Sequence, residues 1–126
     1  MNKIINTTNA PAPIGPYNQA VIANGFLFLS GQIAINPESG VVIQSSISEE
    51  THQVMRNIKA VLLEAGYGFE DVVKTTIFLS DMNLFAEIND IYGAYFENNF
   101  PARETVAVKG LPKGVNVEIS ITAYKS

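Results

Sequence analysis

The clearest pattern of apolar and polar positions lies near the C-terminal end of the chain. Every second side chain from residue 115 to residue 123 is apolar, and this set is Val115, Val117, Ile119, Ile121 and Ala123. A period of two residues is the repeat of a β-strand, whose successive side chains point to opposite faces of a sheet. We therefore predict a strand over residues 115–124, with Glu118 on its polar face.

The segment before this strand, residues 103–110, alternates in the same way. Two valines share one of its faces, and Arg103 and Thr105 share the other. If the valines join the apolar face of the sheet, then Arg103, Thr105 and Glu118 point to the same side. The turn-rich connection between the two strands is short, so we expect these three residues to lie within a few strand spacings of one another.

Other extended segments come earlier in the chain. The step Asn24-Gly25 separates two apolar runs, which is the pattern of a β-hairpin closed by a two-residue turn. Turn residues then lead to a short extended piece, residues 41–43. The β-branched and apolar run from Val72 to Ser80 predicts a central strand.

The first of two predicted helices begins near residue 46. Ser46 or Ser48 can cap it, and Gly66 is placed to end it in the left-handed conformation. Its apolar residues follow the helical period and are Val54, Met55, Ile58, Val61, Leu62 and Ala65. Because strands precede and follow this helix, we expect a right-handed crossover between parallel strands.

The second predicted helix begins at Asp81 or Asn83 and stops before Pro101. Its apolar stripe is Leu84, Phe85, Ile88, Ile91, Tyr92, Tyr95 and Phe96. Two helices cover one face of a sheet, yet the run from Phe26 to Leu29 is apolar on both faces, so a second copy of the chain is expected to cover the other face. The predicted fold class is α+β, with two helices packed on one face of a mixed β-sheet.

Composition and charge narrow the possible functions of this chain, which fits a single domain over residues 1–126. It is 47% hydrophobic and only 16% charged, and its net charge of −4 argues against nucleic acid as a partner, because phosphate binding depends on Lys and Arg. There is no cysteine, and His52 is the single histidine, so we expect neither a thiolate nucleophile nor a metal site. No apolar run approaches membrane-spanning length, and we expect a cytoplasmic protein.

Several short motifs follow one another from Ile4 to Tyr124, among them APAPIGPYNQA, LFLSGQI, VVKTTIFLSDMNLFAEIND, FPAR and NVEI. Together they resemble the Rid family of enamine/imine deaminases, above all its RidA subfamily. The resemblance implies a chorismate-mutase-like α+β fold assembled as a homotrimer, with active sites at the subunit interfaces. It also implies a 2-iminobutanoate/2-iminopropanoate deaminase, which hydrolyses 2-aminoacrylate, through 2-iminopropionate, to pyruvate and ammonia without a cofactor.

The same resemblance implies site residues position by position. The arginine that binds the substrate carboxylate falls on Arg103 and the acidic residue falls on Glu118. The other substrate-binding positions fall on Tyr17, Ser30, Gly31 and Asn89. Thr105 departs from the family, many of whose members carry cysteine two residues after the arginine. We expect Thr105 to act through its backbone groups and small size, with a hydroxyl that could hold a water.

The chemistry of Arg103 and Glu118 agrees with these roles. A planar guanidinium can bind a carboxylate through two parallel hydrogen bonds and orient the adjacent C=N bond. The alternative is a surface arginine beside an acid such as Glu104. A carboxyl that cycles between its two forms can deliver water to carbon and a proton to nitrogen, and partial burial would raise the pKa of Glu118 for that task. The alternative is a solvated acid on the open face of the sheet.

The other candidates also have structural alternatives. Tyr17 can form the wall of a pocket, or it can hold the N-terminal arm to the body of the protein. Gly31 beside Ser30 can let a ligand approach a bare N–H, or it can mark a bulge. Asn89 lies off the apolar stripe of its helix and can simply face solvent.

Three functions therefore stay open at the level of sequence. The first is the hydrolytic deaminase, and the second is a non-catalytic module that binds 2-oxo acids or other small carboxylates in the same cleft. The third is a ribonuclease or translation inhibitor, which the acidic balance of charge disfavours.

Overall fold

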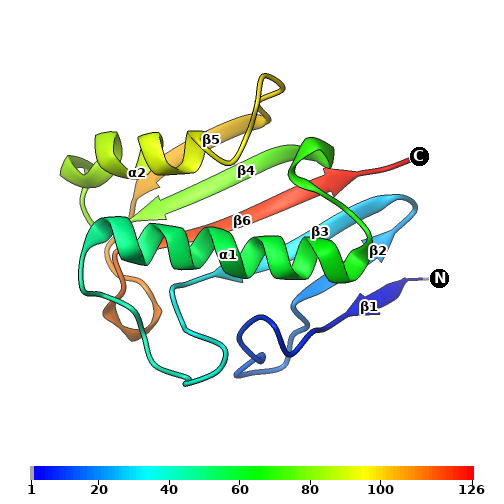
Figure 1. The fold of residues 1–126 in the computed structure, drawn as a ribbon, viewed down its shortest axis with the longest axis horizontal. Coiled ribbons are helices and arrows are strands. Elements are labelled where there is room, and N and C mark those ends of the chain that lie inside the picture. Colours follow the sequence, from blue (N-terminus) through cyan, green and yellow to red (C-terminus); the bar gives the residue numbers. More distant parts are fainter. Residues whose placement is uncertain (1) are drawn as a thin grey trace.

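Both helices pack on one face of a six-stranded mixed sheet (Figure 1). The computed structural model describes residues 2–126, so Met1 of the predicted domain lies outside the described residues. The strands are β1 (Lys3–Ile5), β2 (Ala20–Ala23), β3 (Phe26–Gln32), β4 (Val72–Leu79), β5 (Ala102–Ala107) and β6 (Val117–Tyr124), and the helices are α1 (Ile47–Ala65) and α2 (Phe85–Gly93). The predicted α+β class, with two helices on one face of the sheet, is confirmed.

The sheet order is β1-β2-β3-β6-β4-β5. β6 pairs antiparallel with both β3 and β4, so β3 and β4 run parallel, as the crossover through α1 predicts, but β6 lies between them. β4 and β5, which α2 connects, are parallel neighbours. This order puts Glu118 in an inner strand and Arg103 in an edge strand.

The turns and helix caps that the sequence predicts are present in the structure. Asn24 and Gly25 both have positive φ, at 51° and 86°, which a type I′ hairpin turn requires. The hydroxyl of Ser46 accepts a hydrogen bond from the backbone N–H of Glu49 at 3.0 Å, and Gly66 ends α1 with φ at 80°. Asp81 caps a short 3-10 turn, Met82–Leu84, that leads into α2.

Several elements differ from the sequence prediction: the strand predicted over residues 103–110 is shorter at its end, and the one predicted over 115–124 begins at Val117. α2 ends at Gly93, because glycine is a poor helix former, and Tyr95 and Phe96 follow in turns that still pack on the core. Residues 41–43 form only an isolated bridge, between Val42 and Ile35, and not a strand. β1 was not predicted, since three residues are too few to show an alternating pattern.

The hydrophobic core lies between the sheet and the helices. Fully buried side chains from both layers meet there, and they include Leu27, Ile77, Leu79, Ile119, Met55, Ile58 and Leu62. Burial of each contributes about 2 kcal/mol to folding. The stripe predicted for α1 is therefore its inner face.

The opposite face of the sheet carries no helix (Figure 1). Phe28 and Val106 are 51% and 42% exposed on it, and Phe26 lies against Tyr124 with a distance of 4.7 Å between ring centroids. Large apolar side chains on a solvent-facing sheet are typical of surfaces that another chain covers. We call this surface the open face.

Candidate active site

Arg103 lies on the helix-bearing face, underneath α2. The parallel register pairs it with Thr75, whose side chain is buried in the core layer. Its Nη1 donates a hydrogen bond to Oδ1 of Asn89 at 2.7 Å. Its guanidinium carbon is 5.3 Å from the ring centroid of Tyr92 and 5.6 Å from that of Phe85. Contacts of a cation with two ring faces and an amide fix the plane of the guanidinium.

Tyr92 is held in place by a hydrogen bond to the sheet. Its hydroxyl donates a hydrogen bond to Oγ1 of Thr75 at 3.0 Å, and burial raises the pKa of this hydroxyl, so it stays a protonated donor. Arg103, Asn89 and Tyr92 line a cavity of about 530 Å³ together with Phe100 and Pro101. The guanidinium therefore lies at an open cavity.

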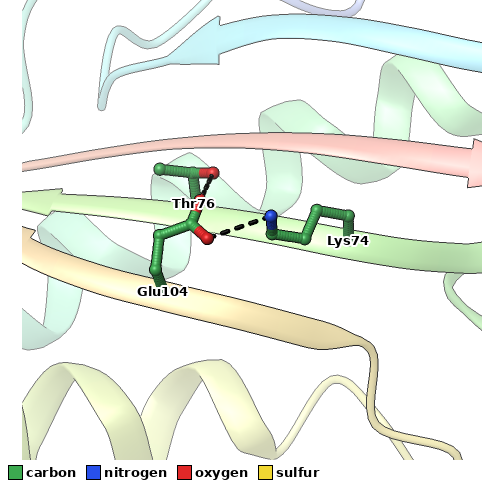
Figure 2. Close-up of polar contacts among 3 residues, drawn as sticks. All are labelled: Lys74, Thr76 and Glu104. Carbon is green, nitrogen blue, oxygen red and sulfur yellow. Dashed lines mark hydrogen bonds and ion pairs between the residues drawn. The ribbon is translucent and has the colours of Figure 1, made fainter.

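Glu104 does not pair with Arg103, so the ion pair between these two sequence neighbours is absent. Its side chain points to the open face, where it binds Nζ of Lys74 at 3.0 Å and the hydroxyl of Thr76 (Figure 2). The hydrogen bond from Thr76 and the ion pair with Lys74 lower the pKa of Glu104. No carboxylate of residues 2–126 lies within ion-pair distance of Arg103, so its outward donors are available for a ligand.

Glu118 lies on the open face, in the inner strand β6 and opposite Phe78 of β4. Its carboxyl lies directly over Gly31: a Cβ at position 31 would be 2.2 Å from Oε2 of Glu118. The β3–β6 register shifts between Leu29 and Gln32, so Gly31 is also part of an irregular stretch. Partial burial raises the pKa of Glu118 above the usual value for glutamate.

A second cavity, of about 410 Å³, contains Glu118. Tyr17, Ser30, Gly31 and Pro112 line it with Glu118. The hydroxyl of Ser30 donates to the carbonyl of Asn18 at 2.7 Å and its N–H donates to the carbonyl of Gln19 at 2.9 Å. Ser30 thus holds the N-terminal arm, and its N–H is not bare.

The expectation that Arg103, Thr105 and Glu118 point to one side of the sheet is wrong. Thr105 pairs with the buried Ile77, whereas Val106 lies on the open face and is 42% exposed. β5 is an edge strand whose side chains are largely exposed, so its valines do not mark the core face. Within one chain the candidates form two groups. The Arg103 group is Arg103, Asn89 and Thr105, and the Glu118 group is Glu118, Gly31, Ser30 and Tyr17.

Comparison with known proteins gives a consistent assignment. Residues 7–125 match the family described as Endoribonuclease L-PSP. The crystal structure of a Yersinia pestis protein of the conserved Rid protein family matches with a TM-score of 0.97 and 49% identity, covering 99% of this chain and 100% of that one. The protein belongs to the Rid family. The human Rid relative named 2-iminobutanoate/2-iminopropanoate deaminase is 43% identical over 99% of this chain and 91% of its own length.

A third relative of this Rid protein was crystallised with a small molecule. The structure of TdcF from E. coli with bound serine matches with a TM-score of 0.94 and 38% identity, covering 98% of this chain and 99% of that one. Among residues 2–126 of the present chain, no group of three or more His, Asp or Glu side chains is placed to hold a metal ion. In the same part of the chain, no helix is long and apolar enough to span a membrane.

Two polar residues of this Rid protein, Thr105 and Gln19, have buried side-chain groups whose surroundings were not predictable from the sequence. Oγ1 of Thr105 is the one buried side-chain polar atom of residues 2–126 without a hydrogen-bond partner. Gln19, only 1% exposed, donates to the carbonyls of Thr7, Ala10 and Pro11 and accepts from the N–H of Thr7. The arm that it holds carries Pro11 and Tyr17 to the second cavity. A lone glutamine at the end of a proline-rich segment was the only sequence signal.

Proposed function

We propose that this protein hydrolyses small imines that carry a carboxylate next to the C=N bond, with 2-iminopropanoate, formed from 2-aminoacrylate, as the model substrate. The observation that carries the proposal is the guanidinium of Arg103. It has no carboxylate partner within the described chain, it is oriented by Asn89 and two aromatic rings, and it borders a cavity. Such a group binds a planar carboxylate through two parallel charge-assisted hydrogen bonds.

We infer that the complete site lies between two copies of the chain. The Arg103 group and the Glu118 group lie on opposite faces of the sheet, so one chain alone does not bring both to one substrate. The exposed aromatic side chains of the open face support an assembly that covers that face. The resemblance to RidA proteins supports three as the number of subunits. In this homotrimer, Arg103 of one protomer meets Glu118 of its neighbour.

The proposed reaction needs one proton carrier and one water. Water attacks the imine carbon, Glu118 takes a proton from that water, and the same proton goes to the nitrogen, which receives the electron pair of the C=N π bond. The new hydroxyl then loses its proton, which reaches the nitrogen, and the C–N bond breaks with its electron pair leaving on ammonia. A carboxyl with a raised pKa exchanges protons more readily near neutral pH than an ordinary glutamate does.

Thr105 has a defined place in this scheme. Its hydroxyl is buried and unpartnered on the same face as Arg103, two residues along β5. A buried polar atom without a partner is costly, and a water held beside it would satisfy it. Since threonine is not a thiolate nucleophile, the proposal involves no covalent intermediate.

The second candidate is a binding module for small carboxylates without turnover. The bound serine in the E. coli relative favours it, because serine also carries a carboxylate. The Endoribonuclease description of the family points to a third activity, against which the net charge of −4 counts. We propose the deaminase as the principal function.

The test generates 2-aminoacrylate in the assay from serine with a pyridoxal-phosphate dehydratase and follows pyruvate release. The proposed function predicts that the protein accelerates release over the spontaneous rate, in proportion to its concentration. Binding of pyruvate without any acceleration would favour the binding module. Light scattering in the same buffer measures the number of subunits, and a monomer would contradict the interfacial site.

A further inference from the structure

A buried carboxylate lies at the beginning of the strand that carries Glu118. Glu50, in the first turn of α1, is 0% exposed. Its Oε2 accepts hydrogen bonds from the backbone N–H of Asn116 at 2.7 Å and of Val117 at 3.2 Å. Its Oε1 accepts a third from Nδ2 of Asn116 at 3.0 Å. All three donors belong to the two residues that immediately precede Glu118.

This arrangement contains no cation. The one ion pair among residues 2–126 is that of Lys74 with Glu104, so three N–H donors alone satisfy the Glu50 carboxylate. A buried charge is costly unless its hydrogen bonds are made, and removal of its partners leaves the penalty in place. The geometry around Glu50 therefore fixes the first residues of β6 closely.

Asn116 joins this contact to Ser80, the residue that follows β4. The N–H of Ser80 donates to the carbonyl of Asn116 at 3.0 Å, and the hydroxyl of Ser80 donates to its Oδ1 at 2.9 Å. Nε2 of Gln44, just before α1, donates to the carbonyl of Gly114 at 3.2 Å. Gln44 thus holds the end of the loop that carries Pro112, and Glu50 holds the first residue of β6.

We propose that Glu50 is a positioning residue for Glu118. It holds residues 116 and 117 so that the next side chain, on the opposite face of the strand, lies with its carboxyl over Gly31 in the cavity that Pro112 also lines. Its kinetic consequence rests on the proposed function. Its effect on the position of the Glu118 side chain does not rest on that function, because this position can be measured whether or not the protein has activity.

The variant Glu50→Gln keeps the shape of the side chain and puts an amide NH2 where one of the N–H donors now finds an oxygen. Glu49→Gln is the matched control, since Glu49 is exposed on the same helical turn and contacts β6 nowhere in the described hydrogen bonds. We expect Glu50→Gln to lower kcat by about 10- to 100-fold while KM stays within about twofold, because a small displacement of a catalytic group costs rate whereas the carboxylate-binding Arg103 is unchanged. Glu49→Gln retains the wild-type kcat.

A purely structural role for Glu50 predicts a different result. In that case the melting temperature of Glu50→Gln falls, but its kcat equals that of the wild type when the rate is divided by the amount of assembled protein that binds pyruvate. This outcome would overturn the inference. Should Glu50→Gln fail to assemble, Asn116→Ala tests the same contact, because it removes one of the three hydrogen bonds. We expect kcat to fall about two- to fivefold with KM unchanged, and an unchanged kcat contradicts the inference.

A crystal structure of whichever variant assembles separates this inference from the proposed function. We expect the Glu118 carboxyl to leave its position over Gly31. If the wild type shows no turnover, the proposed function fails, and the position of Glu118 in the variant still decides on Glu50. A carboxyl that stays over Gly31 overturns the positioning role, whatever the activity.

Discussion

Arg103 and Glu118 are held in place by different kinds of structure. Arg103 lies on the edge strand β5, exposed, and side chains of α2 orient it through one hydrogen bond and two ring contacts. Glu118 lies in the inner strand β6, half buried, with its carboxyl over the backbone of Gly31. The proposed binding group therefore depends on neighbouring side chains, whereas the proposed proton carrier depends on the backbone of the sheet. Substitutions in the two regions should have different kinetic signatures.

The largest expected effect belongs to the Arg103 group. Arg103→Ala removes the two charge-assisted hydrogen bonds that we propose for the substrate carboxylate, and we expect kcat/KM to fall by about 100- to 10,000-fold. Arg103→Lys keeps the charge but loses the two-pronged geometry, and we expect it to recover only a small part of this loss, mainly through KM. Steady-state kinetics of pyruvate release measures both variants. Wild-type kcat/KM in Arg103→Ala contradicts the role of Arg103.

Glu118→Gln should separate turnover from binding. The amide cannot cycle a proton, so we expect kcat to fall by about 100- to 1,000-fold. Because the proposed carboxylate-binding group, Arg103, is unchanged, we expect the affinity for pyruvate, measured by calorimetry, to stay near that of the wild type. If binding falls as much as turnover does, Arg103 and Glu118 do not have the separate roles in binding and proton transfer that we propose.

Gly31→Ala tests whether the backbone under Glu118 fixes its position. The new Cβ would overlap the carboxyl oxygen, at 2.2 Å, and push the flexible end of the side chain aside. We expect a drop in kcat of about 10- to 100-fold with little change in KM. Gly110→Ala is the matched control, because a Cβ there meets no atom within 4 Å. Equal activities of the two variants would contradict this account of Gly31.

The smallest effect concerns stability and pH. Since burial raises the pKa of Glu118 in the folded single chain, that chain holds this proton more tightly than the unfolded chain does. Ionisation of Glu118 therefore lowers stability as pH rises from about 4 through its folded pKa. For the single chain, dissociated from its neighbours, we expect Glu118→Gln to melt slightly above the wild type at pH 7, with the difference closing near pH 4; in the assembly the Arg103 of a neighbour opposes this shift. A lower melting temperature of the variant at pH 7 would contradict the raised pKa.

Features that depend on neighbouring residues were predictable from the sequence. The turn at Asn24-Gly25 and the caps at Ser46 and Gly66 follow from local backbone preferences, and the alternation of β6 gave the face of Glu118 because one side of that strand is fully buried. The face of Arg103 was not predictable in this way. It depends on the parallel pairing of β5 with β4, which lies some thirty residues earlier, and an edge strand has little burial to reveal it.

The buried polar contacts of Glu50 and Gln19 were also not predictable from the sequence. Glu50 and Gln19 look like ordinary surface residues in the sequence, since an acid in the first turn of a helix and a glutamine after a loop are both common. Their roles come from partners 66 and 12 residues away, Asn116 and Thr7. Such contacts form only when the whole fold brings α1 to β6 and the N-terminal arm to the residue before β2.

The central claim is that Arg103 of one protomer and Glu118 of its neighbour form one site, and complementation between two inactive variants tests it most directly. Arg103→Ala and Glu118→Gln chains are mixed in equal amounts, unfolded, refolded together, and assayed for pyruvate release. At random assembly about a quarter of the interfaces pair an intact Arg103 with an intact Glu118, so we predict recovery of about a quarter of the wild-type activity. Mixed oligomers that form but show no more activity than either variant alone would contradict the claim.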